Sequence, residues 1–271
     1  MTVVLGLRIA AVALAVLATA PAHALRFAFE PASRFGAADD AFVMTLRGEI
    51  EEGDLARLKR FIAGHRAQWL DHGGVLVPVI DGGDVDEARL LGAFVAESLG
   101  EVRLPQAGSS RCVSACFFML AQAVERTAVA DTVALHRPHF RRAAIAAAAP
   151  AAARERYAGL LRALRAELVE WSVPHALIER MFATPSDAAA WLDEEELSRL
   201  GRYRPWFAEY ALGRCGLDAY AVRHAAELRA LGDEAGLAAL SRVQAEAGRC
   251  IEALRRAERQ RLLDAIDAAG G

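Results

Sequence analysis

Two residues, Ser114 and His136, have the types and placement of a nucleophile and its base. A serine hydroxyl attacks a carbonyl poorly until a base takes its proton and nearby donors hold the oxyanion that forms. Ser114 lies between Cys112-Val113 and Ala115-Cys116, ahead of an apolar run that predicts a helix. The first N–H groups of a helix have no partner within it and would lie beside this serine. His136 ends a short β-branched run, and a returning strand would bring it back to Ser114.

Strands and helices alternate around these residues. Apolar runs predict strands at 42–50, 75–80, 102–104, 129 and 133–135, and helices at 55–65, with Asp54 as N-cap, and at 85–99. Such alternation predicts an α/β fold of βαβ units with a mostly parallel sheet. Ligands of these sheets bind outside the carboxyl ends of strands. Gly82-Gly83, Ser114 and His136 all follow predicted strands, and the glycines let main-chain N–H groups approach a ligand closely.

The same stretches resemble the Clp-protease/crotonase superfamily and, within it, secreted bacterial proteins with a C-x-S-A-C serine and an H-[RQ]-P histidine. The matching pieces, in order, are Leu46–Ile50 with Gly53-Asp54, Ile80–Val85 with Gly92, and Arg111–Pro138. The resemblance implies a Clp/crotonase-like core. It also implies that Ser114 is the nucleophile, His136 the general base, and the N–H groups of Gly83 and Ala115 the oxyanion hole.

Three features differ from known hydrolase patterns. Where the family's proteases usually have Ser-Pro-Gly-Gly, this chain has Asp81-Gly82-Gly83 without a proline. The acid of the triad has no match, because the expected position within Glu179–Thr184 holds Arg180 or Met181; Asp187, the nearest acid downstream, is the predicted third member. The residues around Ser114 also do not form the G-x-S-x-G elbow of α/β-hydrolases.

Composition divides the chain into three parts. Residues 1–24 are predicted to be a signal peptide, because Arg8 precedes the apolar run Ile9–Ala20 and small residues flank His23 at a signal-peptidase site. The alternative is an uncleaved anchor. Residues 25–204 would form the Clp/crotonase-like domain, and residues 205–271 a helical hairpin extension. That extension either covers the sheet or serves as a docking or oligomerisation arm. The expected location is periplasmic or secreted.

The four cysteines would then meet an oxidising compartment, where disulfides form. A helical hairpin would bring the α-carbons of Cys215 and Cys250 within the ~4.4–6.8 Å that a disulfide needs, so this pair is predicted to be bonded. Cys112 and Cys116 flank Ser114, where a bridge would have to cross a helical turn. They are predicted to be free thiols, buried as small apolar side chains.

Charge and motifs exclude several classes of function. The net charge of −3 gives no reason to expect a nucleic-acid partner. The chain has no H-E-x-x-H or paired C-x-x-C pattern, and the adjacent carboxylates of 193–196 suit the first turn of a helix, so neither a metal nor a cofactor is predicted. No run after residue 24 reaches the ~18 apolar residues of a membrane span.

These observations together predict an exported serine hydrolase that is a peptidase acting on a peptide or protein substrate. A catalytically inactive binding or scaffold module of the same fold is the first alternative. A crotonase-like acyl-CoA enzyme is the second, and export from the cytoplasm argues against it. The oligomeric state is left open, a homo-oligomer included.

Overall fold

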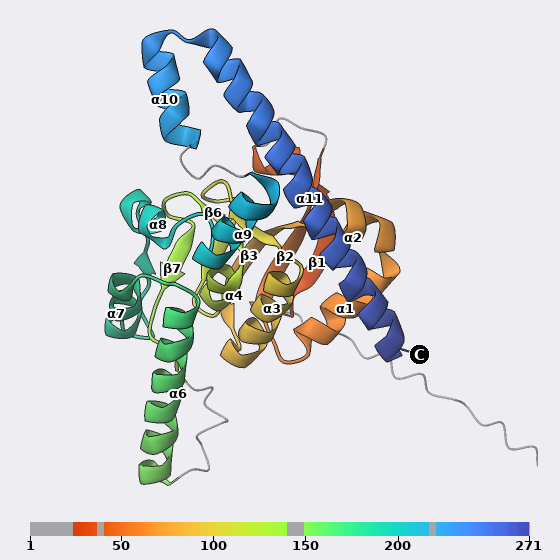
Figure 1. Cartoon of the computed structure of the whole chain (residues 1–271). Helices are drawn as coiled ribbons and strands as arrows, with labels where there is room; N and C mark the ends of the chain where they lie inside the picture. Colours follow the sequence, from red (N-terminus) through yellow and green to blue (C-terminus); the bar gives the residue numbers. More distant parts are fainter. Residues whose placement is uncertain (1–23, 37–40, 140–148, 217–220, 271) are drawn as a thin grey trace, which may run out of the picture.

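A computed structural model describes residues 24–36, 41–139, 149–216 and 221–270 of the protein. One eight-stranded sheet forms its centre, with helices packed against it (Figure 1). The strands are β1 (Arg26–Pro31), β2 (Phe42–Ile50), β3 (Val75–Gly83), β4 (Glu101–Leu104), β5 (Arg111–Val113), β6 (Glu125–Ala128), β7 (Val133–Leu135) and β8 (Ala190–Trp191).

Strand β3 is the branch point of this sheet. It pairs in parallel with β2 on one side. On its other side it pairs in parallel first with β4 and then, nearer its end, with β5. Parallel pairing continues from β4 to β6 and from β5 to β7, whereas β1 and β8 join as antiparallel strands. The predicted α/β class is confirmed, and the sheet is mixed.

Ten α-helices and the 3₁₀ helix η1 (Ala32–Phe35) fall within the described residues. The α-helices are α1 (Asp54–Gly64), α2 (Arg66–His72), α3 (Val85–Glu97), α4 (Cys116–Gln122), α6 (Pro150–Glu170), α7 (His175–Ala183), α8 (Glu194–Leu200), α9 (Pro205–Cys215), α10 (Ala221–Leu231) and α11 (Glu234–Gly270).

Helix α4 lies at the centre of the core, since all seven of its residues are buried. It packs against α3 and against the sheet, and its residues belong to the same apolar cluster as those of β2 and β3. An apolar segment of this length can form a helix only where neighbours cover it on every side. The apolar run after Ser114 is therefore the part of the chain that the rest of the core encloses.

Several predicted boundaries differ from the structure by one to three residues, and two of the differences have an evident cause. The expected N-cap, Asp54, is itself the first residue of α1, and Gly53 precedes it with φ +88°. The buried Asp54 carboxylate instead accepts a hydrogen bond from the N–H of Glu51 at 2.6 Å, which closes the turn between β2 and α1. The strand expected at Val129 ends one residue earlier, at Ala128, because its pairing partner β4 ends at Leu104, opposite Ala128.

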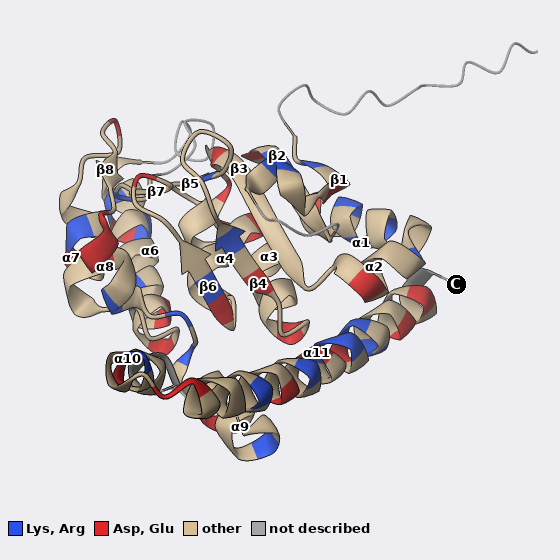
Figure 2. Cartoon of the chain, turned by 90° about the horizontal axis from the view of Figure 1, so that it is seen from above, with Lys and Arg blue, Asp and Glu red and all other residues tan. Residues whose placement is uncertain are grey.

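The C-terminal helix α11 both covers the core and projects from it. Its second half lies along α1 and α2, and Leu262 and Leu263 join the main apolar cluster (Figure 1). The fully buried guanidinium of Arg259 donates to the carbonyl of Leu70 at 2.7 and 3.1 Å. The first half forms a hairpin with α10 that extends beyond the sheet (Figure 1). Basic and acidic residues alternate along α11 (Figure 2).

A carboxylate between two arginines ties α11 to the sheet. Glu125, 4% exposed at the start of β6, accepts hydrogen bonds from Arg255 at 2.5 Å and from Arg202 at 2.8 Å. Burial alone would raise the pKa of Glu125, but the two guanidinium groups outweigh it and hold the pKa below its ordinary value of 4.5. The ionised form of Glu125 therefore stabilises the fold.

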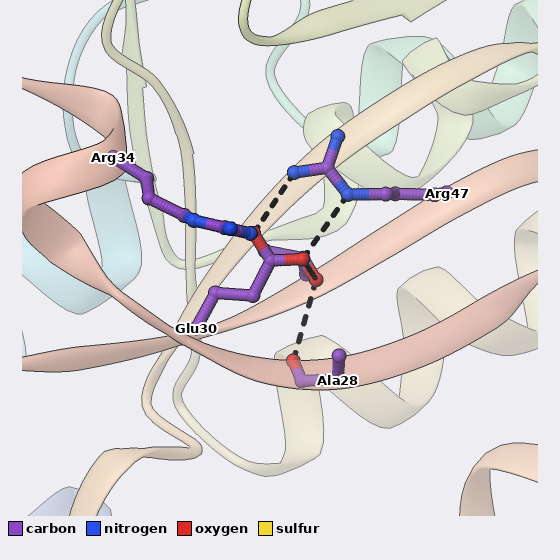
Figure 3. Close-up of polar contacts among 5 residues, drawn as sticks. Ala28, Glu30, Arg34 and Arg47 are labelled. Atoms are coloured by element: carbon purple, nitrogen blue, oxygen red, sulfur yellow. Dashed lines mark hydrogen bonds and ion pairs between the residues drawn. The ribbon is translucent and has the colours of Figure 1, made fainter.

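A second carboxylate fastens the edge strand β1. Glu30 is bonded to Arg47 of β2 at 3.0 Å and to Arg34 at 3.2 Å (Figure 3). The hydrogen bond from Arg47 lowers the pKa of Glu30. Beside it, the hydroxyl of Thr45 donates to the carbonyl of Ala28 at 3.4 Å. These side-chain contacts across β1 and β2 reinforce the antiparallel ladder at the edge of the sheet.

The predicted signal peptide lies outside the described residues, apart from its last residue, Ala24. Ala24 and Leu25 are buried, and Ala24 forms an isolated bridge with Glu49. Among the described residues, no helix combines the length and the apolar character needed to cross a bilayer.

Replacing Glu125 by Gln should lower the free energy of unfolding at pH 7 by about 3 kcal/mol, because it leaves a buried arginine without its counter-charge. The exposed control Glu195→Gln, which removes a partner of Arg199, should cost less than about 0.5 kcal/mol. Because the folded-state pKa of Glu125 is lowered, the wild-type advantage should be complete above pH 4.5 and disappear as the pH falls through that folded-state value. Urea unfolding of wild type and Glu125→Gln at pH 7 and at pH values below the folded-state pKa measures this difference in unfolding free energy. A difference that does not change with pH would contradict the prediction.

Candidate active site

Three neighbouring parallel strands end at the residues that the sequence singles out. Strand β3 runs into Gly82-Gly83, Ser114 follows β5, and His136 follows β7. The register places Ile80 beside Cys112, and Val113 beside Ala134. The N–H of Ser114 donates to the carbonyl of Ala134 at 3.0 Å. The carboxyl ends of these strands therefore bring the glycine pair, the serine and the histidine to one edge of the sheet.

Ser114 has a left-handed backbone conformation, with φ +57°. It lies at the turn between β5 and α4, and its carbonyl accepts a hydrogen bond from the N–H of Phe117 at 3.0 Å. A non-glycine residue pays about 1–2 kcal/mol to adopt this conformation, so the surrounding structure must hold it there. In α/β-hydrolases the serine nucleophile also lies on a strained, sharp turn from strand to helix. Here it occurs without the flanking glycines that would have revealed it in the sequence.

A disulfide encloses this turn. Cys112 and Cys116 are bonded, with their α-carbons 5.1 Å apart, so the prediction that they are free thiols was wrong. That prediction assumes that positions i and i+4 are separated by a helical turn. The structure instead puts Cys112 in β5 and Cys116 at the first position of α4, and the sharp turn at Ser114 brings the two together. The predicted bond between Cys215 and Cys250 is confirmed, with α-carbons 5.5 Å apart.

The glycine pair leaves room for Ser114 on one side and for β2 on the other. A Cβ on Gly82 would lie 3.2 Å from Ser114 Cβ and 3.6 Å from Ser114 Oγ, so the serine side chain extends over Gly82. A Cβ on Gly83 would lie 2.1 Å from the carbonyl oxygen of Ile50. Both glycines have φ near +130°, a region that other residues rarely adopt. Only glycine fits at these two positions.

The two main-chain N–H groups predicted for an oxyanion hole belong to Gly83 and Ala115. The N–H of Asp84 donates to Ile50 at 2.8 Å, and Ile50 is the ladder partner of Gly83. In a parallel ladder the partner residue directs its own N–H to the opposite side, so the N–H of Gly83 points away from β2 and towards β5. Within the part of the chain that the structure describes, the N–H of Ala115 makes no hydrogen bond. Both donors predicted for an oxyanion hole thus lie next to Ser114.

His136 is half-buried and follows β7 directly. Its Nδ1 lies 3.1 Å from the carbonyl oxygen of Arg137, an acceptor that requires Nδ1 to carry the proton. In the neutral ring this leaves Nε2 as the basic nitrogen. Among the described residues, Ser114 Oγ and the His136 ring are not hydrogen-bonded. The two residues therefore lie on adjacent strands without forming the contact of an assembled dyad.

Asp187, the predicted third member of the triad, is exposed in the loop between α7 and β8. That loop reaches the histidine segment, because the N–H of Arg137 donates to the carbonyl of Thr184 at 2.9 Å. No hydrogen bond joins Asp187 to His136 in the described part of the chain. The role of Asp187 stays a prediction.

An ion pair that the sequence did not reveal connects β3 and β5 below the site. The guanidinium of Arg111 binds the carboxylate of Asp81 through two hydrogen bonds, one of them 2.6 Å long. Both side chains are exposed, by 42% and 62%, so the pair stabilises the fold by at most about 1 kcal/mol. Nowhere in the described residues do three or more His, Cys, Asp or Glu side chains group as they would around a metal ion.

Gly83→Ala should lower the free energy of unfolding by more than about 2 kcal/mol, since the new Cβ collides with main-chain atoms of Ile50 that cannot move freely. Gly108→Ala is the matched control, because Gly108 also has a positive φ, +87°, but has no atom within 4 Å of the added Cβ. It should cost only about 1 kcal/mol. Urea unfolding of the two variants tests this, and equal losses would show that the close approach of β2 is not the constraint.

No protein-family model matches the chain, and neither a curated protein nor a solved structure matches it.

Proposed function

We propose that the protein is an exported serine hydrolase, and within that class a peptidase of the Clp/crotonase type, with Ser114 as its nucleophile. The left-handed Ser114 at the turn from β5 to α4 is the observation that carries the proposal. Such strain persists where the surrounding structure fixes it, and it is concentrated at functional sites. Ser114 and His136 are both partly accessible, as a nucleophile and its base must be.

The arrangement supports an acyl-transfer mechanism. His136 Nε2 takes the proton of Ser114 Oγ as the oxygen attacks the substrate carbonyl. The N–H groups of Gly83 and Ala115 hold the oxyanion, and collapse of the tetrahedral intermediate releases the amine, which takes the proton from His136. Water then hydrolyses the acyl-enzyme by the same steps. The carbonyl of Arg137 fixes the ring tautomer, and the mechanism requires the hydrogen bond between His136 Nε2 and Ser114 Oγ to form when substrate binds.

A peptide is the substrate class that we propose. A cavity of about 390 Å³ lies at β2, β3 and β5, and its lining mixes apolar, basic and acidic groups. Ser114 and His136 are not among its lining residues, so its role in the proposal is a subsite for side chains that flank the cleaved bond. It is lined by Ala24, Arg26, Arg47, Gly48, Glu49, Val79, Asp81 and Arg111. An extended peptide can place alternate side chains in such a cavity while its main chain follows the sheet. Two disulfides agree with a periplasmic or secreted location, where such bonds persist.

A catalytically inactive binding module of the same fold is the second candidate. It is favoured by one observation, that Ser114 and His136 are not hydrogen-bonded and that no carboxylate contacts the ring among the described residues. In that case the glycine pair and the turn would bind a peptide without cleaving it.

A fluorophosphonate probe should label the wild-type protein at Ser114. Ser114→Ala should abolish labelling, and His136→Ala should slow it by more than about a thousandfold, because the serine then loses its base. His139→Ala is the matched control, since that ring lies 5.9 Å from His136 and has no role in the mechanism. It should label at the wild-type rate. Equal labelling of all four proteins, or none of the wild type, would leave the inactive module as the better description.

The sequence predicts that Asp187 orients His136, whereas the structure offers the carbonyl of Arg137 for the same task. If the carbonyl is sufficient, Asp187→Asn should change the labelling rate by less than about twofold. Loss of a true triad aspartate costs about 10⁴-fold in related mechanisms. A fall of a hundredfold or more in the Asn variant would identify Asp187 as the third catalytic residue. Measuring the rate against pH separates the two cases further, since an orienting carboxylate would also shift the pH dependence.

A further inference from the structure

We propose that the Cys112–Cys116 disulfide is the positioning element of the nucleophile, so that the reactivity of Ser114 depends on the oxidation state of these two cysteines. The inference rests on the proposed hydrolase function for its activity readout. It concerns a regulatory property of that site, a reversible loss of the reactive serine when the protein meets a dithiol reductant.

The bond joins the two elements whose junction bears the strain. Cys112 belongs to β5 and Cys116 is the first residue of α4, and Ser114 lies midway between them with φ +57°. Both cysteines are fully buried. The bond therefore fixes the strand to the helix on either side of the only left-handed residue in this turn, within residues 111–122 of the described chain.

Hydrogen bonds alone secure the turn incompletely. The N–H of Cys112 donates to Thr132 at 2.8 Å and that of Ser114 to Ala134 at 3.0 Å, so the strand side is anchored in the sheet. On the helix side, the N–H of Phe117 donates to Ser114 at 3.0 Å, while the N–H of Ala115 has no partner among the described residues. Without the crosslink, Ser114 is free to relax towards a conformation with negative φ, and relaxation would turn Oγ and the N–H of Ala115 away from their present positions.

The two disulfides differ in what they constrain. Cys215 and Cys250 are 35 positions apart and close a long loop between α9 and α11, so that bond mainly restricts the unfolded chain. Cys112 and Cys116 are only 4 positions apart, and closing so short a loop restricts the unfolded chain less. The effect of the short bond is therefore expected in the local conformation of Ser114 more than in global stability.

The redox step is an ordinary thiol–disulfide exchange. A thiolate of the reductant attacks one sulfur, forming a mixed disulfide and releasing the other cysteine as a thiol, and the reductant's second thiol then displaces the first cysteine. The protein gains two electrons and two protons, and the dithiol becomes a cyclic disulfide. Because both cysteines are buried, the reduction requires a transient opening of the turn.

The Cys215→Ala/Cys250→Ala variant isolates the bond in question, since it leaves Cys112–Cys116 as its one disulfide. This variant should react with the fluorophosphonate probe at the wild-type rate. Adding dithiothreitol should slow labelling at least tenfold and produce two titratable thiols, and reoxidation should restore the rate. The Cys112→Ala/Cys116→Ala variant should be labelled equally slowly without reductant, while its circular dichroism spectrum stays that of the wild type.

A second measurement does not depend on catalysis. The ¹³Cα and ¹³Cβ chemical shifts of Ser114 should indicate a left-handed residue in the Cys215→Ala/Cys250→Ala variant and move towards negative-φ values on reduction. Unchanged Ser114 shifts after reduction, or an unchanged labelling rate with two free thiols, would overturn the inference. If the wild type fails to label but the shifts move, the hydrolase function fails while the role of the disulfide in holding Ser114 stands.

Discussion

The close approach of β2 to the end of β3 is the constraint on which the site depends. A side chain at Gly83 would collide with the main chain of Ile50, and one at Gly82 would press on Ser114. Strand β3 can therefore continue between β2 and β5 as far as Gly83, which carries its last N–H to the level of Ser114. Strand β5 pairs in register with β3, and β7 pairs in register with β5. Ser114 and His136, which follow β5 and β7, therefore lie at the same edge of the sheet.

The strained conformation of Ser114 is sustained by the rigidity of the elements that flank it. Helix α4 is buried along its entire length, and β5 is hydrogen-bonded to a strand on either side. These two elements anchor the ends of the turn, and the disulfide ties them to each other across Ser114. The energy stored in the left-handed serine, about 1–2 kcal/mol, is small compared with the burial that fixes its neighbours.

The C-terminal region is anchored by charges rather than by apolar packing alone. Glu125, the first residue of β6, binds Arg255 of α11. Arg259 of α11 donates to the carbonyl of Leu70 in α2. Buried groups of this kind are costly to separate, so they specify where the helix lies. The bond between Cys215 and Cys250 adds a covalent link from the end of α9 to the middle of α11.

The sequence by itself determined the features that follow from local pattern. The apolar run of 42–50 is a strand with those bounds, the glycine pair ends β3, and Cys215 pairs with Cys250. Only the tertiary structure decided that Ser114 is left-handed, that Cys112 bonds to Cys116, and that the Arg137 carbonyl meets His136. These features arise because β3, β5 and β7 pair in one register and α4 is enclosed by the core. Contacts between distant segments set both conditions, and no spacing along the chain records them.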